Sequence, residues 1–256
     1  MLHVTGLSKA YKTAQNKDVT QALSDINFSL DEGASLAIVG PSGCGKSTLL
    51  RLIAGLITPT EGSISIHGED VTKPRKKTAF MLQDFGLLPW KTVEQNAGLA
   101  LQLQGVPAVQ RKKLIHQVLS DVGLFDFRKA YPSSLSGGMK QRLSLARALS
   151  MDSDLLLMDE PLSALDAFLR EDMQVLLKNT WLKHSYTQII VTHSIAEAVF
   201  LGEKIIVMSP LPGKIVSVFE NPHVKDKDWR TQDGFHALTS AVRESLLEAK
   251  GGMKHA

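Results

Sequence analysis

The residues GPSGCGKST, from Gly40 to Thr48, follow a short apolar run, Leu36–Val39, and precede a helical pattern over Leu49–Leu56. The glycines let the backbone turn tightly, so that consecutive N–H groups can point inward and form a nest for an anion. The partial positive charge of the following helix N-terminus adds to this nest. A strand, a glycine-rich loop and a helix in this order are the context of a P-loop, which binds phosphate groups.

Side chains of the P-loop have separate expected roles. Lys46 supplies a full positive charge to the β- and γ-phosphates of a nucleotide, the Ser47 hydroxyl can ligate Mg²⁺, and Thr48 can reach the α-phosphate side. Cys44 does no required chemistry, but a helix N-terminus and Lys46 beside its thiol predict a lowered pKa. We therefore expect alkylation of Cys44 to block nucleotide binding and Cys44→Ala to keep activity. The expected phosphate-binding set is Gly40, Pro41, Ser42, Gly43, Cys44, Gly45, Lys46, Ser47 and Thr48.

A second apolar run, Leu155–Met158, ends in two carboxylates, Asp159 and Glu160. Asp159 can hold Mg²⁺, usually through water, because a hard cation prefers oxygen ligands. Glu160 is one residue further along, so it projects differently and can polarise an attacking water. The alternative is that Asp159, Glu160 and Pro161 only form a helix-capping turn.

The composition sets broad limits on the class of protein. With 256 residues, 43% apolar and 21% charged, the chain can form one domain with subdomains around a sizeable core. No run approaches the roughly 20 apolar residues of a membrane span, and the N-terminal residues lack a secretory signal. We therefore expect a cytoplasmic protein unless another subunit holds it at a membrane. The net charge of +3 is too small to indicate nucleic acid binding.

The apolar runs between helical patterns predict a mainly parallel sheet, because near-continuous apolar strands are typical of sheets covered on both faces. By contrast, Ser63–His67 alternates strictly and predicts an exposed antiparallel strand, which Leu2–Val4 and Ile26–Leu30 can join in a small N-terminal layer. The predicted buried strands are Leu36–Val39, Thr78–Leu82, Leu155–Met158, Ile189–Val191 and Ile205–Met208.

The strand signal stops between the second and third of these runs. There Val93–Gln104, Ala108–Val122 and Met139–Leu149 carry helical spacing, which predicts a helical subdomain over residues 84–150. Near the end of the chain, Phe235–Ala249 predicts a short amphipathic helix.

The expected fold class is α/β. It is a P-loop NTPase (RecA-like) core with a mainly parallel sheet, a small antiparallel layer and the inserted helical subdomain. We expect this nucleotide-binding domain to cover residues 1–222 and a short tail to cover residues 223–256.

The sequence LSGGMKQR, over Leu135–Arg142, offers a second surface for an anion. Ser136, Gly137 and Gly138 precede the helix Met139–Leu149, so they present a hydroxyl and N–H groups at a helix N-terminus. One triphosphate cannot serve two such surfaces on one chain, so the economical arrangement is two copies, head to tail, with the nucleotide between them. The alternative is an ordinary helix N-cap.

These motifs, with SALD over Ser163–Asp166 and His193 after an apolar run, resemble the ATP-binding subunit of ABC transporters. The resemblance covers roughly Leu2–Pro222 and implies ATP hydrolysis with Mg²⁺ by a cassette dimer. It implies that Tyr11 stacks on adenine and that Gln83 senses Mg²⁺ and the attacking water. The other implied roles are contact with the γ-phosphate of the opposite subunit for Ser136 and Gly138, metal binding for Asp159, water activation for Glu160, the dimer interface for Asp166, and the γ-phosphate for His193.

Two of these residues have plain alternatives, since Tyr11 could be a surface aromatic and His193 a satisfied core histidine. The sequence departs slightly from the family pattern, with Lys140 where arginine is commoner and Asp84 where glutamate is frequent. Neither departure removes a required chemical group.

The segment after Gln83, Phe85–Trp90, is apolar and aromatic. The resemblance to ABC transporters implies that this region forms a groove for a short helix of a membrane subunit. The alternative is that Leu87, Leu88 and Trp90 only cover the core of the helical subdomain. The longer segment LLPWKTVEQN, with Ser209–Ile215 downstream, is similar to importers of nitrate, sulfonate and taurine.

The resemblance implies a peripheral subunit on the cytoplasmic face of the inner membrane, held by a permease. Its implied partners are a second copy, the permease and, indirectly, an extracytoplasmic solute-binding protein, but no nucleic acid. A soluble ABC ATPase of DNA repair or translation would carry a long coiled-coil insertion or a second cassette. A GTPase or small-molecule kinase would lack LSGG and SALD.

Overall fold

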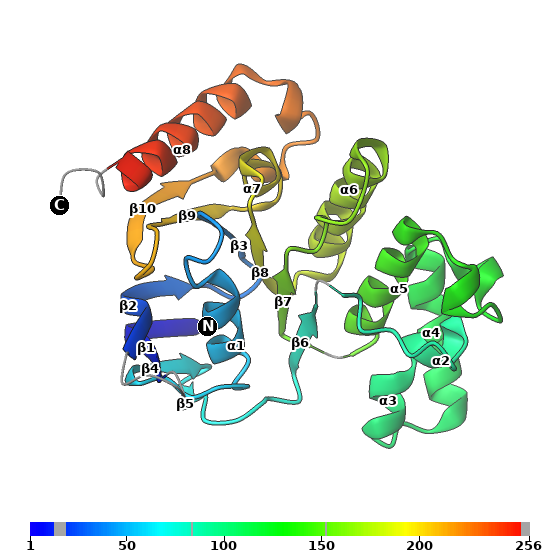
Figure 1. The fold of residues 1–256 in the computed structure, drawn as a ribbon. Coiled ribbons are helices and arrows are strands. Elements are labelled where there is room, and N and C mark those ends of the chain that lie inside the picture. Colours follow the sequence, from blue (N-terminus) through cyan, green and yellow to red (C-terminus); the bar gives the residue numbers. More distant parts are fainter. Residues whose placement is uncertain (13–18, 83, 152, 252–256) are drawn as a thin grey trace. The chain divides into compact units, whose positions relative to one another are not determined.

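The computed structural model describes residues 1–12, 19–82, 84–151 and 153–251 (Figure 1). The chain divides into two compact units, each of which is taken by itself below. Unit 1 consists of residues 1–75 and 187–256, and unit 2 of residues 76–186. The domain boundaries expected from the sequence stay predictions.

The predicted antiparallel layer is confirmed in unit 1. Its strands are ordered β2-β1-β4-β5, with every neighbouring pair antiparallel. Leu2 is buried and pairs with Leu30 on one side and Ile66 on the other. The three predicted strands are longer than expected: β1 is Leu2–Lys12, β2 is Val19–Leu30 and β4 is Glu61–Ile66. The short strand β5 (Glu69–Asp70) was not predicted.

Unit 1 also contains four strands of a mainly parallel sheet, in the order β10-β9-β3-β8, of which β9, β3 and β8 were predicted. The central strand β3 (Ser35–Val39) is parallel to both β8 (Thr187–Thr192) and β9 (Lys204–Met208). All residues of β3 and β8 are buried, as their continuous apolar runs predicted. The antiparallel edge strand β10 (Ile215–Glu220) was not predicted; it alternates half-buried and exposed residues.

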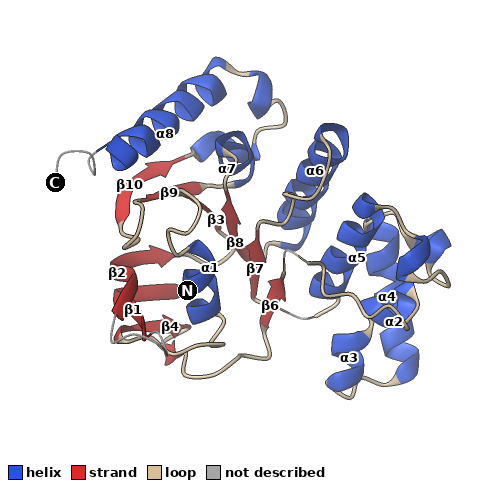
Figure 2. Ribbon diagram, viewed as in Figure 1, coloured by secondary structure: helices blue, strands red, loops and turns tan. Residues whose placement is uncertain are grey.

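Three α-helices belong to unit 1, and Figure 2 distinguishes them from the strands. Helix α1 (Lys46–Ile53) follows the P-loop and contacts β2 and β8. Helix α7 (Ile195–Leu201) packs on β3, and α8 (Asp233–Gly251) packs on α7, β9 and β10. Helix α7 was not predicted, and α8 extends beyond the predicted amphipathic run.

The C-terminal segment is fastened to α7 by buried side chains. The Asn221 amide donates hydrogen bonds to the main-chain oxygens of Val199 and Gly202, at 2.7 and 2.8 Å. The Trp229 indole donates to the same oxygen of Val199 at 3.2 Å. These donors satisfy carbonyls that the last turn of a helix leaves unpaired.

Unit 2 contains the parallel pair β6 (Thr78–Met81) and β7 (Leu155–Asp159) together with five α-helices. The run predicted as one helix over Val93–Gln104 is two helices that meet at Gly98, a residue type that weakens a helix interior. The helices are α2 (Val93–Ala97), α3 (Leu99–Leu103), α4 (Ala108–Asp121), α5 (Gly137–Leu149) and α6 (Ala167–His184).

Helix α6 was not predicted from the sequence, since its apolar residues are not gathered into one stripe. Short 3₁₀ turns cover Phe125–Phe127 and Pro132–Ser134 in unit 2, and Pro222–Lys225 and Trp229–Thr231 in unit 1. Over the described ranges, no helix has both the length and the apolar character needed to cross a membrane.

Candidate functional site

The P-loop connects β3 to α1 through a backbone that glycine permits. Gly43 and Gly45 have φ angles of 78° and 99°, in the left-handed region. The Lys46 ammonium is buried and donates hydrogen bonds of 2.9 Å to the main-chain oxygens of Gly40 and Pro41. The loop therefore wraps around its own lysine, with Gly43 exposed on the other side.

The expected low pKa of Cys44 is wrong. Its side chain is only 1% exposed, and burial raises the pKa of the thiol above its ordinary value, although Lys46 acts in the opposite direction. Desolvation of the thiolate outweighs the nearby charge, because a charged form loses more from burial than a neutral one. Cys44 is thus a buried neutral thiol beneath the loop, where alkylation requires the loop to open.

His193 lies at the same edge of the sheet as the P-loop. Val39 at the end of β3 pairs with Thr192 at the end of β8, so that Gly40 and His193 follow neighbouring strand ends. His193 is exposed, which rules out the alternative of a core histidine. The chain on its C-terminal side is fixed by Ser194, which donates to Thr192 Oγ1 at 3.0 Å and caps α7.

Tyr11 lies on β1 in unit 1 and is 40% exposed. The Lys9 ammonium lies over its ring, 5.3 Å from the centroid. An exposed aromatic face can stack on a base, but it can equally be a surface residue, so the adenine role of Tyr11 stays a prediction.

In unit 2, Asp159 and Glu160 stand where β7 ends. Asp159 is the last residue of the strand and is buried, and Glu160 is half-buried with a φ of 48°. A left-handed backbone at a residue other than glycine costs on the order of 1 kcal/mol and is typical of functional sites. The main-chain oxygen of Glu160 accepts a 3.0 Å hydrogen bond from Ser163 Oγ. The N-cap of the next helix, α6, is Asp166, and the roles of Asp159 and Glu160 stay predictions.

Gln83 lies outside the described residues. Strand β6, which precedes it, is parallel to β7, and Met81 pairs with Met158. The two strands therefore end at the same edge of the sheet, where Asp159 lies. The catalytic and metal roles of Gln83 stay predictions.

Ser136 and Asp166 are the N-caps of two helices that contact each other. The Ser136 hydroxyl accepts a hydrogen bond from the Met139 N–H of α5, and Asp166 accepts one from the Leu169 N–H of α6, at 3.3 and 3.1 Å. A Cβ on Gly138 would lie 3.3 Å from Leu169, which brings the two helix starts close together. The sequence analysis gave Asp166 an interface role and missed its capping role.

The segment after residue 83 is held by side chains that the sequence analysis did not single out. Arg147 and Ser144 of α5 donate to the main-chain oxygen of Phe85, at 2.8 and 3.2 Å. The buried Asn96 accepts from Leu88 N–H and donates to the oxygens of Leu88, Lys91 and Thr92, all within 3.1 Å. Asn96 is the last residue of the motif LLPWKTVEQN, which the sequence offered only as part of a family resemblance.

Trp90 stands on this segment and is 70% exposed, so it does not seal the helical subdomain. Elsewhere in unit 2, a cavity of about 230 Å³ has a largely apolar lining. Its lining includes Phe80, Leu99, Leu103 and Arg147.

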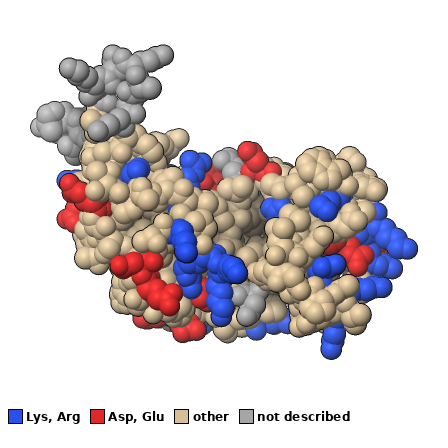
Figure 3. Space-filling model, turned by 90° about the horizontal axis from the view of Figure 1, so that it is seen from below, with Lys and Arg blue, Asp and Glu red and all other residues tan. Residues whose placement is uncertain are grey.

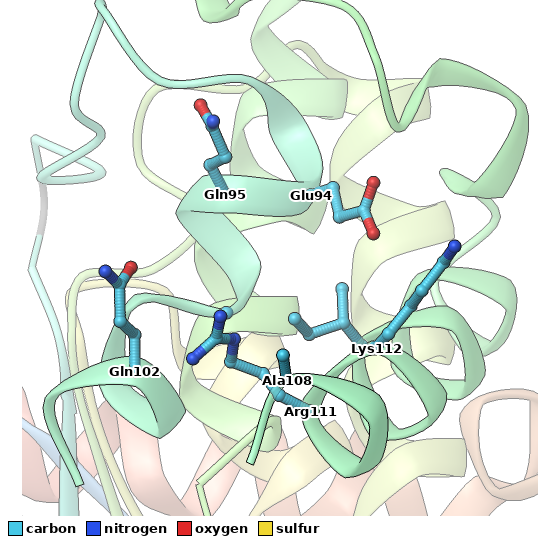
Figure 4. A pocket seen from close by; sticks show the side chains of 8 residues that line it. Glu94, Gln95, Gln102, Ala108, Arg111 and Lys112 are labelled. Atoms are coloured by element: carbon cyan, nitrogen blue, oxygen red, sulfur yellow. The ribbon is translucent and has the colours of Figure 1, made fainter. Parts of the chain in front are cut away.

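A second cavity of unit 2, of about 250 Å³, lies between α2, α3 and α4. Figure 4 shows Glu94 and Lys112 extending toward each other on one side and Arg111 near Gln102 on the other. None of the predicted site residues that the structure describes lines it.

The surface carries both signs of charge. On the face shown in Figure 3, acidic and basic side chains are both present and much of the area is neither. This matches the small net charge of the chain.

In unit 1, the glycine-dependent loop offers main-chain N–H groups and the Lys46 ammonium for the phosphates of a nucleotide, and the Ser47 hydroxyl is an oxygen ligand of the kind that Mg²⁺ prefers. In unit 2, the Asp159 carboxylate is a ligand of the same kind.

Comparison with known proteins agrees with this chemistry. Residues 23–163 match the family model described as ABC transporter. An aliphatic sulfonates import ATP-binding protein of Bacillus cereus is 43% identical over 98% of this chain and 96% of its own length. A taurine import ATP-binding protein of Roseobacter denitrificans is 42% identical over 86% of this chain and 82% of its own.

The fold is similar to that of solved ATP-binding cassettes. A dimeric cassette in a post-hydrolysis state, bound to ADP and Pi, superposes with a TM-score of 0.76 and 32% identity. The superposition covers 86% of this chain and 98% of that one.

Proposed function

The chain belongs to the ABC transporter family, and from this premise we propose that it powers uptake of a sulfonate or a related small solute by hydrolysing ATP. The observation that carries the proposal is the P-loop, in which Gly43 and Gly45 are left-handed and the buried ammonium of Lys46 is bonded to the oxygens of Gly40 and Pro41. The proposed solute class is supported by relatives that are named for aliphatic sulfonates and taurine.

The residues act by holding charge in place. The P-loop N–H groups, Lys46 and Thr48 bind the phosphates, and His193 contacts the γ-phosphate from the neighbouring strand end. Ser47 and Asp159 would hold Mg²⁺, which would supply positive charge to the phosphates. Glu160 accepts a hydrogen bond from the attacking water and polarises it. The remaining roles, for Tyr11, Gln83, Ser136, Gly138 and Asp166, are those that the family resemblance implies.

Two copies of the cassette form the working enzyme, in line with the dimeric cassettes that share this fold. The signature residues Ser136 and Gly138 of one copy contact the γ-phosphate bound by the other. ATP thus joins the copies, and hydrolysis removes the link that holds them.

A membrane permease is the partner that turns this cycle into transport. We place its contact on unit 2, where the exposed Trp90 supplies an aromatic anchor and the cavity beside Phe80 and Leu103 supplies an apolar surface. The cassette is therefore peripheral at the cytoplasmic face of the cell membrane. An extracytoplasmic solute-binding protein delivers the solute to the permease.

The test uses Glu160→Gln, with Glu244→Gln on the exposed face of α8 as the matched control. Glu160→Gln should bind MgATP, sediment as a dimer, and lose about a hundredfold or more in turnover, because a general base contributes on the order of 10² to 10⁴. Glu244→Gln should turn over like the unmodified protein. Near-normal turnover of Glu160→Gln, or a strict monomer with MgATP, would contradict the proposed mechanism.

Deletion of the gene, followed by uptake assays with taurine, alkanesulfonates and nitrate, tests the solute. Loss of uptake of one sulfonate, restored by the unmodified gene but not by Lys46→Ala, is the expected result. Unchanged uptake of all of them would contradict the solute class but leave the ATPase assignment intact.

A further inference from the structure

The loop between β9 and β10, Ser209–Lys214, lies against the P-loop and is bonded to β2. Gly213 N–H donates to the main-chain oxygen of Ala22, and the Gly213 oxygen accepts from Ser24 N–H, both at 3.0 Å. The loop is also closed on itself, because the Ser209 hydroxyl accepts from Lys214 N–H at 2.9 Å and donates to the Pro212 oxygen at 3.0 Å. Gly213 is therefore held in place from both sides.

The P-loop approaches these two segments more closely than a side chain would allow. A Cβ on Gly213 would overlap the main-chain oxygen of Cys44. A Cβ on Gly45 would lie 2.7 Å from the Leu23 side chain and 2.8 Å from the Ala22 oxygen. The underside of the P-loop thus rests directly on main chain from β2 and from the β9–β10 loop.

This contact has a consequence for the phosphate-binding side of the loop. The oxygen of Cys44 and the N–H of Gly45 belong to one planar trans peptide and point in opposite directions. With the oxygen directed at Gly213, the N–H of Gly45 is directed away from it. An N–H fixed in this way needs no reorientation when it meets an anion.

We propose that Gly213 is a positioning residue of the nucleotide site, which sets the orientation of the Cys44–Gly45 peptide. The inference rests on the proposed function, namely that the P-loop binds the phosphates of ATP. Gly213 touches no phosphate itself and belongs to none of the motifs that identify the site. Its effect is confined to the diphosphate end of the nucleotide, since His193 reaches the γ-phosphate from β8.

The test is Gly213→Ala, with Leu211→Ala as the matched control, because Leu211 is in the same loop and 44% exposed. Calorimetry with MgADP and with MgATP measures both affinities at a temperature where every variant is folded. Gly213→Ala should weaken both by about tenfold or more, because a displaced N–H loses a charge-assisted hydrogen bond. The ratio of the two affinities should stay within about twofold of the unmodified value. Leu211→Ala should change neither affinity by more than about twofold.

If Gly213 had only a structural role, Gly213→Ala would lower the thermal midpoint and leave the MgADP affinity of the folded protein unchanged. An affinity for MgADP equal to that of the unmodified protein therefore overturns the inference. Should Gly213→Ala fail to fold, Ser209→Ala serves instead, because it opens the same loop from its other end. It should weaken MgADP binding severalfold more than Leu211→Ala, and equal binding by these two variants overturns the inference. If the unmodified protein binds no nucleotide, the proposed function fails too.

Discussion

The guanidinium of Arg147 donates a 2.8 Å hydrogen bond to the main-chain oxygen of Phe85, and a second bond to that of Gly86. Phe85 and Gly86 are both left-handed, with φ angles of 56° and 57°. Burial lowers the pKa of Arg147 below its ordinary value, because the charge has lost part of its water. The turn after residue 83 is thus held to α5 by one partly desolvated charge.

Replacing Arg147 by methionine should lower the free energy of unfolding by roughly 2–3 kcal/mol, because two hydrogen bonds from a charged donor are lost and only the Phe85 oxygen keeps its bond from Ser144. Urea unfolding measures the change. The matched control is Arg142→Met on the same helix, where a single 3.3 Å bond to Val122 is lost. Equal losses in the two variants would mean that the turn at Phe85 contributes nothing specific.

Asn96→Ala should cost about 3 kcal/mol of stability, since it removes four hydrogen bonds from a buried amide. Gln95→Ala, one residue earlier and exposed, removes only the capping-box bond to Thr92 and should cost about 1 kcal/mol or less. Hydrogen exchange should show faster exchange of the Leu88 amide in Asn96→Ala alone. If the Leu88 amide stays protected in both variants, the Asn96 side chain does not hold this segment in place.

The Cys44 thiol should make stability depend on alkaline pH. Because burial raises its pKa above the ordinary 9.0, the folded chain keeps a proton that the unfolded chain loses. The stabilising contribution is therefore complete below about pH 9 and falls as the pH rises from there toward the raised value. Urea unfolding between about pH 8 and about pH 10 should show a steeper loss for the unmodified protein than for Cys44→Ala. Parallel curves would show that the thiol is not desolvated.

Trp229 should be a core residue of unit 1. Trp229→Ala should cost about 3–5 kcal/mol, because it leaves a cavity between α7 and α8 and loses the bond to Val199. Trp229→Phe keeps most of the ring volume and should cost about 1 kcal/mol for the lost hydrogen bond. Thermal unfolding followed by circular dichroism measures both. If the alanine variant loses less than about 1 kcal/mol of unfolding free energy, the C-terminal helix does not unfold cooperatively with the rest of unit 1.

The strands of the sheet were predictable because buried parallel strands have a continuous apolar signal, as in Leu155–Met158. Helix α6 carries no comparable stripe, and β10 has no fully buried residue, so neither gave the apolar signal on which the prediction relied. The division of one predicted helix at Gly98 was missed, although glycine is a poor helix former.

In the site, too, some features could be predicted from the sequence and others could not. The identity of the P-loop residues could be derived from spacing, and the structure adds the geometry of Lys46 and the left-handed Glu160. The pKa of Cys44 was predicted with the wrong sign, because a sequence shows the neighbouring charge of Lys46 but not the depth of burial. Asn96, Arg147 and Gly213 were missed since each acts through a contact that only the fold creates.

The contact between Gly213 and the P-loop also bears on synthesis. The loop that ends at Thr48 rests on a residue 165 positions further along the chain (213 − 48). At roughly 5–20 residues per second, a ribosome needs on the order of ten seconds or more to reach Gly213 after Thr48. A nascent cassette therefore carries its phosphate-binding sequence well before the supporting loop exists. The supported form of the P-loop can therefore be reached only after Gly213 has been synthesised.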